Sequence, residues 1–180
     1  MDIYVLRHGT TNWNEKGISQ GRSQNRLSKS GVELVKQRAK ENKDLPVDII
    51  YSSPLFRTIQ TTNIFNKYHN AKVVKDKRLI EIDQGVFTGR KYTSLTDEEK
   101  ILRFARSKSC GMESYKEVFN RVKDFIKNLL KNEKQEHVLI VAHDAVCTSI
   151  DYILTNTQPD FNDNKKMNMF NNAELRKYKV

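Results

Sequence analysis

The chain has 180 residues, the usual length of one domain; 37% of them are hydrophobic and 30% are charged. This balance excludes a disordered tail, a collagen-like fibre and a coiled coil as descriptions of the whole chain. The longest unbroken apolar run, Val138–Ala142, is far too short to cross a bilayer, and Arg7 and His8 end the first apolar run before a signal peptide could form. We therefore expect a soluble, cytoplasmic protein with no membrane partner.

The chain is strongly basic, with 32 lysines and arginines against 22 acidic residues and a formal net charge of +10. A polyanionic partner such as nucleic acid is the first hypothesis for such a charge. However, only 11 of the 32 are arginines, and the sequence has no RNP motif, zinc finger or arginine-rich arm. We interpret the excess as a solvated, lysine-rich surface, and we predict no nucleic-acid partner.

Cysteine and histidine usage gives no sign of a metal site. Cys110 and Cys147 lie in no CxxC pair, which fits a reducing compartment and excludes a disulfide framework. The four histidines show no HExxH or other spacing typical of metal ligands. We therefore predict that the protein needs no metal and no other cofactor.

In the first part of the chain, short apolar runs alternate with helical patterns. Ile3–Leu6 predicts a buried strand that stops at Gly9, and the polar residues 9–29 predict a long functional loop. A helix is expected from Ser30, as its N-cap, to about Lys43, and a second strand over Asp48–Ser52.

Ser53 and Pro54 predict the start of the next helix, with Ser53 as N-cap and Pro54 at the first helical position. Ile59, Ile64 and Phe65 are expected to form its buried side. The elements predicted after it are, in chain order, a strand at Val73–Val74, a loop over 81–95, a helix over 96–107 beginning at Thr96, a helix from Ser114 to about Asn132, a strand at Val138–Ala142, a helix capped by Asp144 and reaching about Leu154, and an edge strand within Asn172–Val180.

This alternation predicts an α/β fold, in which a mostly parallel sheet is covered by helices on both faces. Sites in such folds form beyond the carboxyl ends of the strands. Arg7 and His8 follow the first strand, the helix that carries Arg57 follows the second, and His143 follows the fourth. We therefore expect these four side chains to share one rim of the sheet.

The residue types at this rim favour an anion as the ligand. Arginine is suited to bidentate recognition of phosphate, and a neutral histidine is a nucleophile. Structural roles are the alternatives: His8 could cap a strand, Arg57 could be a solvated helix residue, and His143 could be a satisfied buried histidine. From the residues alone, we predict a phosphate site with a histidine that could act as nucleophile.

The segment Arg7–Asn14, RHGTTNWN, resembles the signature of the histidine phosphatase superfamily, in its phosphoglycerate-mutase-like branch. Gln20–Gly21 and three further blocks match this family in the right order, at Tyr51–Thr61, Leu79–Gly85 and Val141–His143. The tripeptide RHG alone is a weak match, but four ordered blocks over nearly the whole chain are specific. The resemblance implies a phosphoglycerate-mutase-like three-layer α/β/α sandwich, with residues 1–180 forming a single histidine-phosphatase domain.

The resemblance also implies catalytic roles. His8 would attack phosphorus and form a phosphohistidine, which divides one displacement into two easier steps. Arg7, Arg57 and His143 would hold the transferring oxygens and balance their charge. Glu81 would protonate the leaving oxygen and later take a proton from the attacking water.

Substrate contacts are implied for Asn14 and for the backbone around Thr11, Gln20 and Gly21. The implied ligand is a small phosphorylated metabolite. The sequence does not fix the oligomeric state, for which a monomer and a homodimer are both open.

Three positions leave alternatives open. Asp83 lies near Glu81 and could be the acid instead, although the spacing to Gly85 favours Glu81. Asp144 stands where the family commonly has glycine; beside a phosphate it must be turned away or paired, or it could cap a helix or contact a substrate hydroxyl. Arg26, where the family commonly has proline, could contact a second anion or lie in solvent.

A phosphoglycerate mutase must keep its phosphohistidine from water, and such members usually carry insertions that close over the site. Only about fifteen residues separate Glu81 from the helix near Thr96. The sequence therefore favours a metal-independent phosphatase that acts on small phosphate monoesters, such as sugar phosphates, phosphoglycerate-type acids or α-ribazole phosphate. Phosphoglycerate mutase-type transfer is the alternative, and a non-catalytic protein that binds a phosphorylated ligand is a less favoured one.

Overall fold

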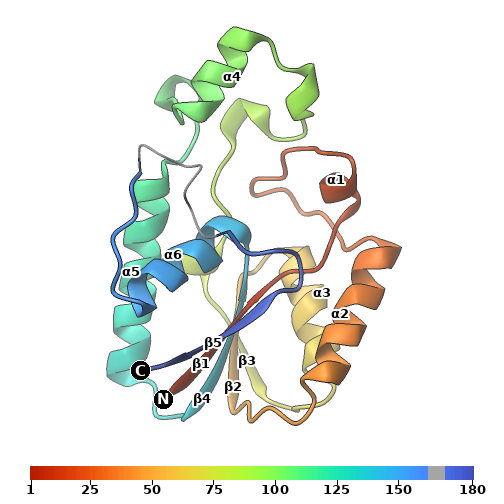
Figure 1. Ribbon diagram of the computed structural model, residues 1–180, viewed down its shortest axis with the longest axis vertical. Helices are drawn as coiled ribbons and strands as arrows, with labels where there is room; N and C mark the ends of the chain where they lie inside the picture. The colour runs from red at the N-terminus through yellow and green to blue at the C-terminus, as the bar shows by residue number, and fades with distance from the viewer. Residues whose placement is uncertain (162–168) are drawn as a thin grey trace.

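The computed structural model describes residues 1–161 and 169–180, and within these residues it forms one five-stranded sheet with the strand order β3-β2-β4-β1-β5 (Figure 1). The strands are β1 (Asp2–Arg7), β2 (Ile49–Ser52), β3 (Lys72–Lys75), β4 (His137–Ala142) and β5 (Leu175–Lys179). β1 to β4 run parallel, and β5 pairs antiparallel with β1 at the edge. The predicted mostly parallel sheet and the final edge strand are both confirmed.

Helices cover both faces of this sheet. α2 (Lys29–Glu41) and α3 (Phe56–Phe65) lie on one face, and α5 (Tyr115–Asn132) and α6 (Asp144–Leu154) lie on the other (Figure 1). Alternate residues of β1 serve the two layers, since Ile3 and Val5 pack with α5 and α6 while Tyr4 and Leu6 pack with α2 and α3. The three-layer sandwich is therefore confirmed. Among the described residues, no helix is both long and apolar enough to cross a membrane.

Shorter elements lie beyond the carboxyl ends of the strands. They are the helices α1 (Asn12–Glu15) and α4 (Asp97–Phe104) and the 3₁₀ turns η1 (Lys77–Leu79), η2 (Gly85–Phe87), η3 (Tyr92–Ser94) and η4 (Lys108–Cys110). α4 lies at the far end of the molecule from the chain termini (Figure 1). Thr96 caps α4 as predicted, with its side chain accepting from the Glu99 N–H, but the helix ends at Phe104 rather than at 107.

The predicted start of α2 is wrong by two residues. Ser28, and not Ser30, is the N-cap, because its hydroxyl accepts the Gly31 N–H at 3.1 Å. The hydroxyl of Ser30 instead donates to the Glu15 carboxylate. The hydroxyls of Ser28 and Ser30 both donate to the Glu15 carboxylate and therefore tie the first turn of α2 to the end of α1 (Asn12–Glu15).

The predicted starts of α3 and α6 are also wrong, for a shared reason. Leu55, and not Ser53, is the N-cap residue of α3, and Ser53 and Pro54 lie in the segment that leaves β2. The Ser53 hydroxyl lies 2.8 Å from His143 Nε2. His143 is the N-cap residue of α6, and Asp144 is its first helical residue. The Asp144 carboxylate accepts instead from the Phe170 N–H at 3.0 Å. In both cases the side chain that the sequence predicted as a helix cap instead contacts a residue from a distant segment of the chain.

The buried side of α3 is polar. Phe65 is buried as predicted, whereas Ile59 and Ile64 are only half-buried. The remaining buried residues are one arginine and three threonines: Arg57, Thr58, Thr61 and Thr62. α3 therefore presents hydrogen-bonding groups, rather than an apolar stripe, toward the region beyond β1.

We expect Gly31→Ala to destabilise the fold, because a Cβ at this position would lie 1.9 Å from the carbonyl oxygen of Thr10. The clash should lower the free energy of unfolding by about 1–3 kcal/mol, as overpacking does elsewhere, when measured by urea denaturation. Lys29→Ala, at an exposed position of the same turn, is the control and should change little. A gain in stability for Gly31→Ala, as alanine gives in an open helix, would contradict this packing.

Candidate active site

A cavity of about 270 Å³ lies beyond the carboxyl ends of β1 and β4. Its lining residues come from the end of β1, α1 and the loop beside it, the loop after η1, α4, α5, α6 and the segment before β5. They are Arg7, His8, Asn14, Ile18, Ser19, Gln20, Gly21, Glu81, Ile82, Gln84, Arg103, Tyr115, Asp144, Ala145, Thr148 and Met169. The cavity is smaller than the roughly 300–1,000 Å³ of sites for drug-sized ligands, which favours a small metabolite.

His8 follows β1 and is held in one tautomer. Its Nδ1 lies 2.7 Å from the Gly9 carbonyl oxygen, which can only accept a hydrogen bond. Nδ1 therefore carries the proton, and Nε2 carries a lone pair. Burial, and then the charges of Arg57 and Arg7, hold the pKa of His8 well below its usual range. The ring is neutral and nucleophilic at ordinary pH.

Arg57 is fully buried behind His8. Its Nε donates to His8 Nε2 at 3.3 Å, and its two terminal nitrogens donate at 2.8 Å to the carbonyl oxygens of Ser23 and Gly21. Burial lowers the pKa of Arg57 to about 10, while the nearby Glu81 acts in the opposite direction. The guanidinium remains charged and connects the histidine to the loop that lines the cavity.

His143 and Arg7 each leave a polar atom without a partner. Among the described residues, His143 Nδ1 and Arg7 Nε are buried and make no hydrogen bond. Buried polar atoms are nearly always satisfied, so these two donors are unusual. Arg7 lines the cavity, whereas His143 lies beside it, with Nδ1 4.0 Å from the carboxylate of the lining residue Glu81. The His143 ring also packs edge-on against His8, with centroids 5.2 Å apart. Burial, followed by the charge of Arg57, keeps the pKa of His143 well below its usual range.

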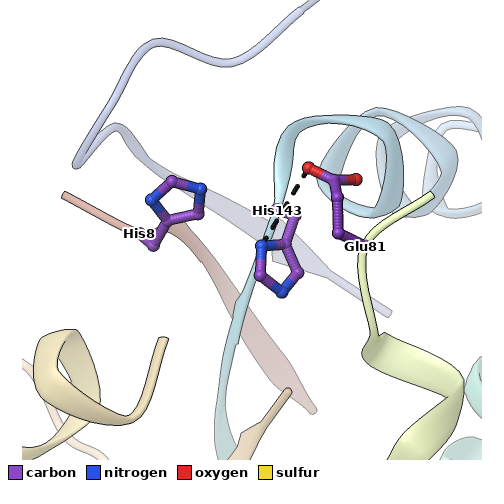
Figure 2. Close-up of side chains that lie close together, drawn as sticks. All are labelled: His8, Glu81 and His143. Carbon is purple, nitrogen blue, oxygen red and sulfur yellow. Dashed lines mark ion pairs between the residues drawn. The ribbon is translucent and has the colours of Figure 1, made fainter. Parts of the chain in front are cut away.

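Glu81 lies in the loop after η1, with its side chain 13% exposed. One carboxylate oxygen accepts from the Ile82 N–H at 2.9 Å, and the other lies 4.0 Å from His143 Nδ1. Burial raises the pKa of Glu81 above that of an ordinary glutamate, against the opposing charge of Arg57. Figure 2 shows His8, Glu81 and His143 converging from three separate segments.

These three side chains could in principle hold a metal ion, since one ligand atom from each lies within 4.8 Å of the others. The surroundings argue against a cation. Arg57 already donates to the lone pair that His8 would offer, and the Gly9 carbonyl holds its other nitrogen. The charges of Arg7 and Arg57 favour an anion at this position.

The residues predicted to contact substrate divide into two groups. Asn14, Gln20 and Gly21 line the cavity. Thr11 is buried outside the lining; its N–H and hydroxyl both donate to Asn14 Oδ1, and its hydroxyl also lies 2.9 Å from Gln20 Oε1. Thr11 therefore orients the two lining side chains of Asn14 and Gln20.

The structure also places the two residues whose roles the sequence left open. Asp144 lines the cavity and is paired, because its Oδ1 lies 3.6 Å from Arg7 Nη1 and accepts from the Phe170 N–H. Arg26 is exposed outside the cavity, and its guanidinium stacks 4.9 Å from the centre of the Phe56 ring. Of the two alternatives for Arg26, the structure therefore favours the position in solvent over a contact with a second anion.

Of the lining residues that were not predicted from the sequence, five have polar side chains: Ser19, Gln84, Arg103, Tyr115 and Thr148. Arg103 lies in α4, where the sequence showed only a helix pattern. No local motif marks it, because it reaches the cavity only when the segment from η3 to η4 folds over the strand ends. The Arg90 guanidinium, bonded to the Glu99 carboxylate at 2.9 Å, is one of the contacts that place this segment.

Sheet order and site together define the phosphoglycerate-mutase-like class of α/β proteins, in which a histidine at the end of the first strand faces arginines and a second histidine. A family model described as the histidine phosphatase superfamily, branch 1, matches residues 3–179. The chain belongs to this superfamily.

Relatives within the superfamily carry different activities in their names. Phosphoserine phosphatase 1 of Hydrogenobacter thermophilus is 33% identical over 147 residues, which are 78% of this chain and 70% of that protein. A probable phosphoglycerate mutase, GpmB of an Enterobacter species, is 33% identical over 149 residues, which are 79% of this chain and 69% of that protein. The solved structure of Bacillus stearothermophilus YhfR shares the fold with a TM-score of 0.87 and 22% identity, over 99% of this chain and 91% of that one.

We expect His8 to stay neutral at pH values where an ordinary histidine is half protonated. The midpoint of its ring titration, followed by NMR, should lie well below 6.5 in the free protein. Arg57→Met should move this midpoint upward, because the variant removes a positive charge beside the ring. Arg26→Met removes an equal charge at the exposed position and should leave it unchanged. A His8 midpoint at or above 6.5 would contradict the geometry.

Proposed function

We propose that the protein is a metal-independent phosphatase that hydrolyses small phosphate monoesters through a phosphohistidine on His8. The observation that carries the proposal is the state of His8: a neutral ring, with its lone pair on Nε2, held among arginines at a small cavity. The orphaned Arg7 Nε and His143 Nδ1 are available to bind phosphate oxygens. Family membership and the phosphatase names among the relatives also support this function.

In the first step, His8 Nε2 attacks phosphorus and the bond from phosphorus to the ester oxygen breaks. Arg57 releases its long contact with Nε2 and turns its charge to the phosphoryl oxygens, together with Arg7. Glu81 donates a proton to the leaving oxygen, for which its raised pKa suits it. An alcohol leaves, and the phosphoryl group stays on His8.

In the second step, Glu81 is an ionised carboxylate and takes a proton from a water molecule. That water attacks phosphorus, and the bond to Nε2 breaks. Inorganic phosphate leaves, and His8 and Glu81 return to their starting states. One carboxyl group serves as acid and then as base, because the intermediate separates the two steps in time.

The cover over the cavity favours hydrolysis over transfer. It consists of α4, which has eight residues, and the short turns beside it. Mutase-type phosphoryl transfer is the second candidate, and the observation that favours it is the similarity to a probable phosphoglycerate mutase. Phosphoserine, from the name of the phosphatase relative, is the first natural substrate to test.

We expect His8→Ala to lose phosphatase activity by more than about a thousand-fold, since the nucleophile is removed. The assay follows hydrolysis of p-nitrophenyl phosphate with a chelator present, and acid-labile phosphohistidine is trapped in the wild type. His137→Ala is the control, because His137 lies at the start of β4, at the other end of this strand from His143. Activity that persists in His8→Ala, or that disappears with the chelator, would overturn the proposal. Turnover that depends on a bisphosphoglycerate primer would indicate the mutase alternative.

We expect Glu81→Gln to separate substrates by their leaving groups. Phosphoserine, whose alkoxide leaves poorly without a proton, should lose about a hundred-fold or more in kcat/KM, whereas p-nitrophenyl phosphate should lose much less in its phosphorylation step. The wild-type rate for phosphoserine should fall as the pH rises past the raised pKa of Glu81, because the acid form is lost, and the variant should lack this limb. Asp83→Asn tests the rival acid. Equal losses for both substrates in Glu81→Gln would exclude the acid role.

A further inference from the structure

One wall of the cavity has no part in the proposed phosphoryl transfer. α4 contributes Arg103 to this wall, and the Arg103 Nε is buried with no hydrogen-bond partner among the described residues. A terminal nitrogen of the same side chain makes only a long contact, 3.4 Å, with the Ser19 hydroxyl. A guanidinium that lines a ligand cavity with so few partners retains most of its donors for a ligand.

The neighbours of Arg103 in the cavity are also donors. Ser19 offers a hydroxyl, and Gln84 offers the N–H groups of its amide, since its oxygen already accepts from Arg106 at 3.0 Å. Arg106 itself is buried and holds the backbone of the loop before η2 through the Asp83 carbonyl oxygen. Arg103, Ser19 and Gln84 therefore form a group of donors that is distinct from the group at His8. We call it the α4 subsite.

Surrounding contacts hold Arg103 in place. Its guanidinium lies over the Tyr92 ring, 5.4 Å from the ring centre. Arg90 bonds Glu99 in the first turn of α4, and Arg106 fixes the chain just beyond the last turn through the Glu113 carbonyl oxygen at 2.9 Å. A guanidinium held in this way loses little side-chain entropy when it binds a ligand.

We propose that the α4 subsite binds a carboxylate of the substrate, so that the preferred substrates are phosphate monoesters that also carry a carboxylate. This inference rests on the proposed phosphatase function and adds the class of substrate to it. A guanidinium matches a planar carboxylate through two parallel hydrogen bonds, and the hydroxyl and amide can donate to the remaining lone pairs.

The charges in the cavity favour a carboxylate over a second phosphate. Asp144 lines the same cavity and adds negative charge to it. Arg7 is already shared between Asp144 and the proposed phosphate position. Arg103 is then the cation left for a second anionic group, and one positive charge balances a monoanionic carboxylate better than a dianionic phosphate.

The test compares substrates that differ only in the carboxylate: phosphoserine against phosphoethanolamine, and 3-phosphoglycerate against glycerol 3-phosphate. Wild type should prefer the carboxylate-bearing member of each pair. Arg103→Met should lower kcat/KM for those members by about ten- to a hundred-fold, mainly through KM, and leave the other members within about two-fold. Arg103→Lys should restore only part of the loss, because an ammonium lacks the planar fork.

Lys100→Met is the matched control, because it removes one positive charge from a half-buried position of the same helix that does not line the cavity and where Lys100 pairs with Asp97. It should leave all four rates unchanged. An equal fall for both members of each pair in Arg103→Met, or a wild type without any preference, would overturn the α4 subsite. Hydrolysis of p-nitrophenyl phosphate that depends on His8 would show that the phosphatase function stands in that case, and its absence would show that the function itself fails.

Discussion

The site depends on one buried cation. Arg57 lies in the first turn of α3 with no exposed surface, and its three donor nitrogens reach His8 and two carbonyl oxygens of the loop after β1. A buried guanidinium is costly unless every donor is satisfied. Its geometry therefore fixes the distance between α3, the end of β1 and the loop over Gly21–Ser23 at once. The threonines on the buried side of α3 extend the same polar contact, and Gly9 N–H donates to one of them, Thr61.

This cation also sets the chemistry of the site. Burial of the ring, and then the charge of Arg57, hold the pKa of His8 well below its usual range, while the Gly9 carbonyl fixes the proton on Nδ1. Burial raises the pKa of Glu81, because it disfavours the charged form of a carboxyl group as it does that of the histidine. A neutral histidine beside a carboxyl group with a raised pKa suits the two-step phosphoryl transfer that we propose. The unsatisfied Arg7 Nε and His143 Nδ1 complete a region prepared for an anion.

In the function that we propose, specificity has a different structural origin from catalysis. The residues proposed for catalysis follow strand ends or lie in the loop after η1, where the buried sheet positions them. Arg103 instead lies in α4, a short helix in which no described residue is buried. Its position depends on ion pairs and on Arg106.

The amino-acid sequence by itself determined the α/β sandwich, because near-continuous apolar runs predict buried parallel strands. It also predicted that His8, Arg57 and His143 lie at one rim of the sheet, because each of them follows such an apolar run. Only the tertiary structure decided that Ser28, rather than Ser30, caps α2, and that Asp144 pairs with Arg7 instead of capping α6. Only it brought Arg103 to the cavity. The physical reason is the sequence separation of the interacting groups. The burial of a strand is visible in the hydrophobicity of neighbouring residues. A helix cap, an ion pair or a cavity wall depends instead on competition among groups that lie far apart in the chain.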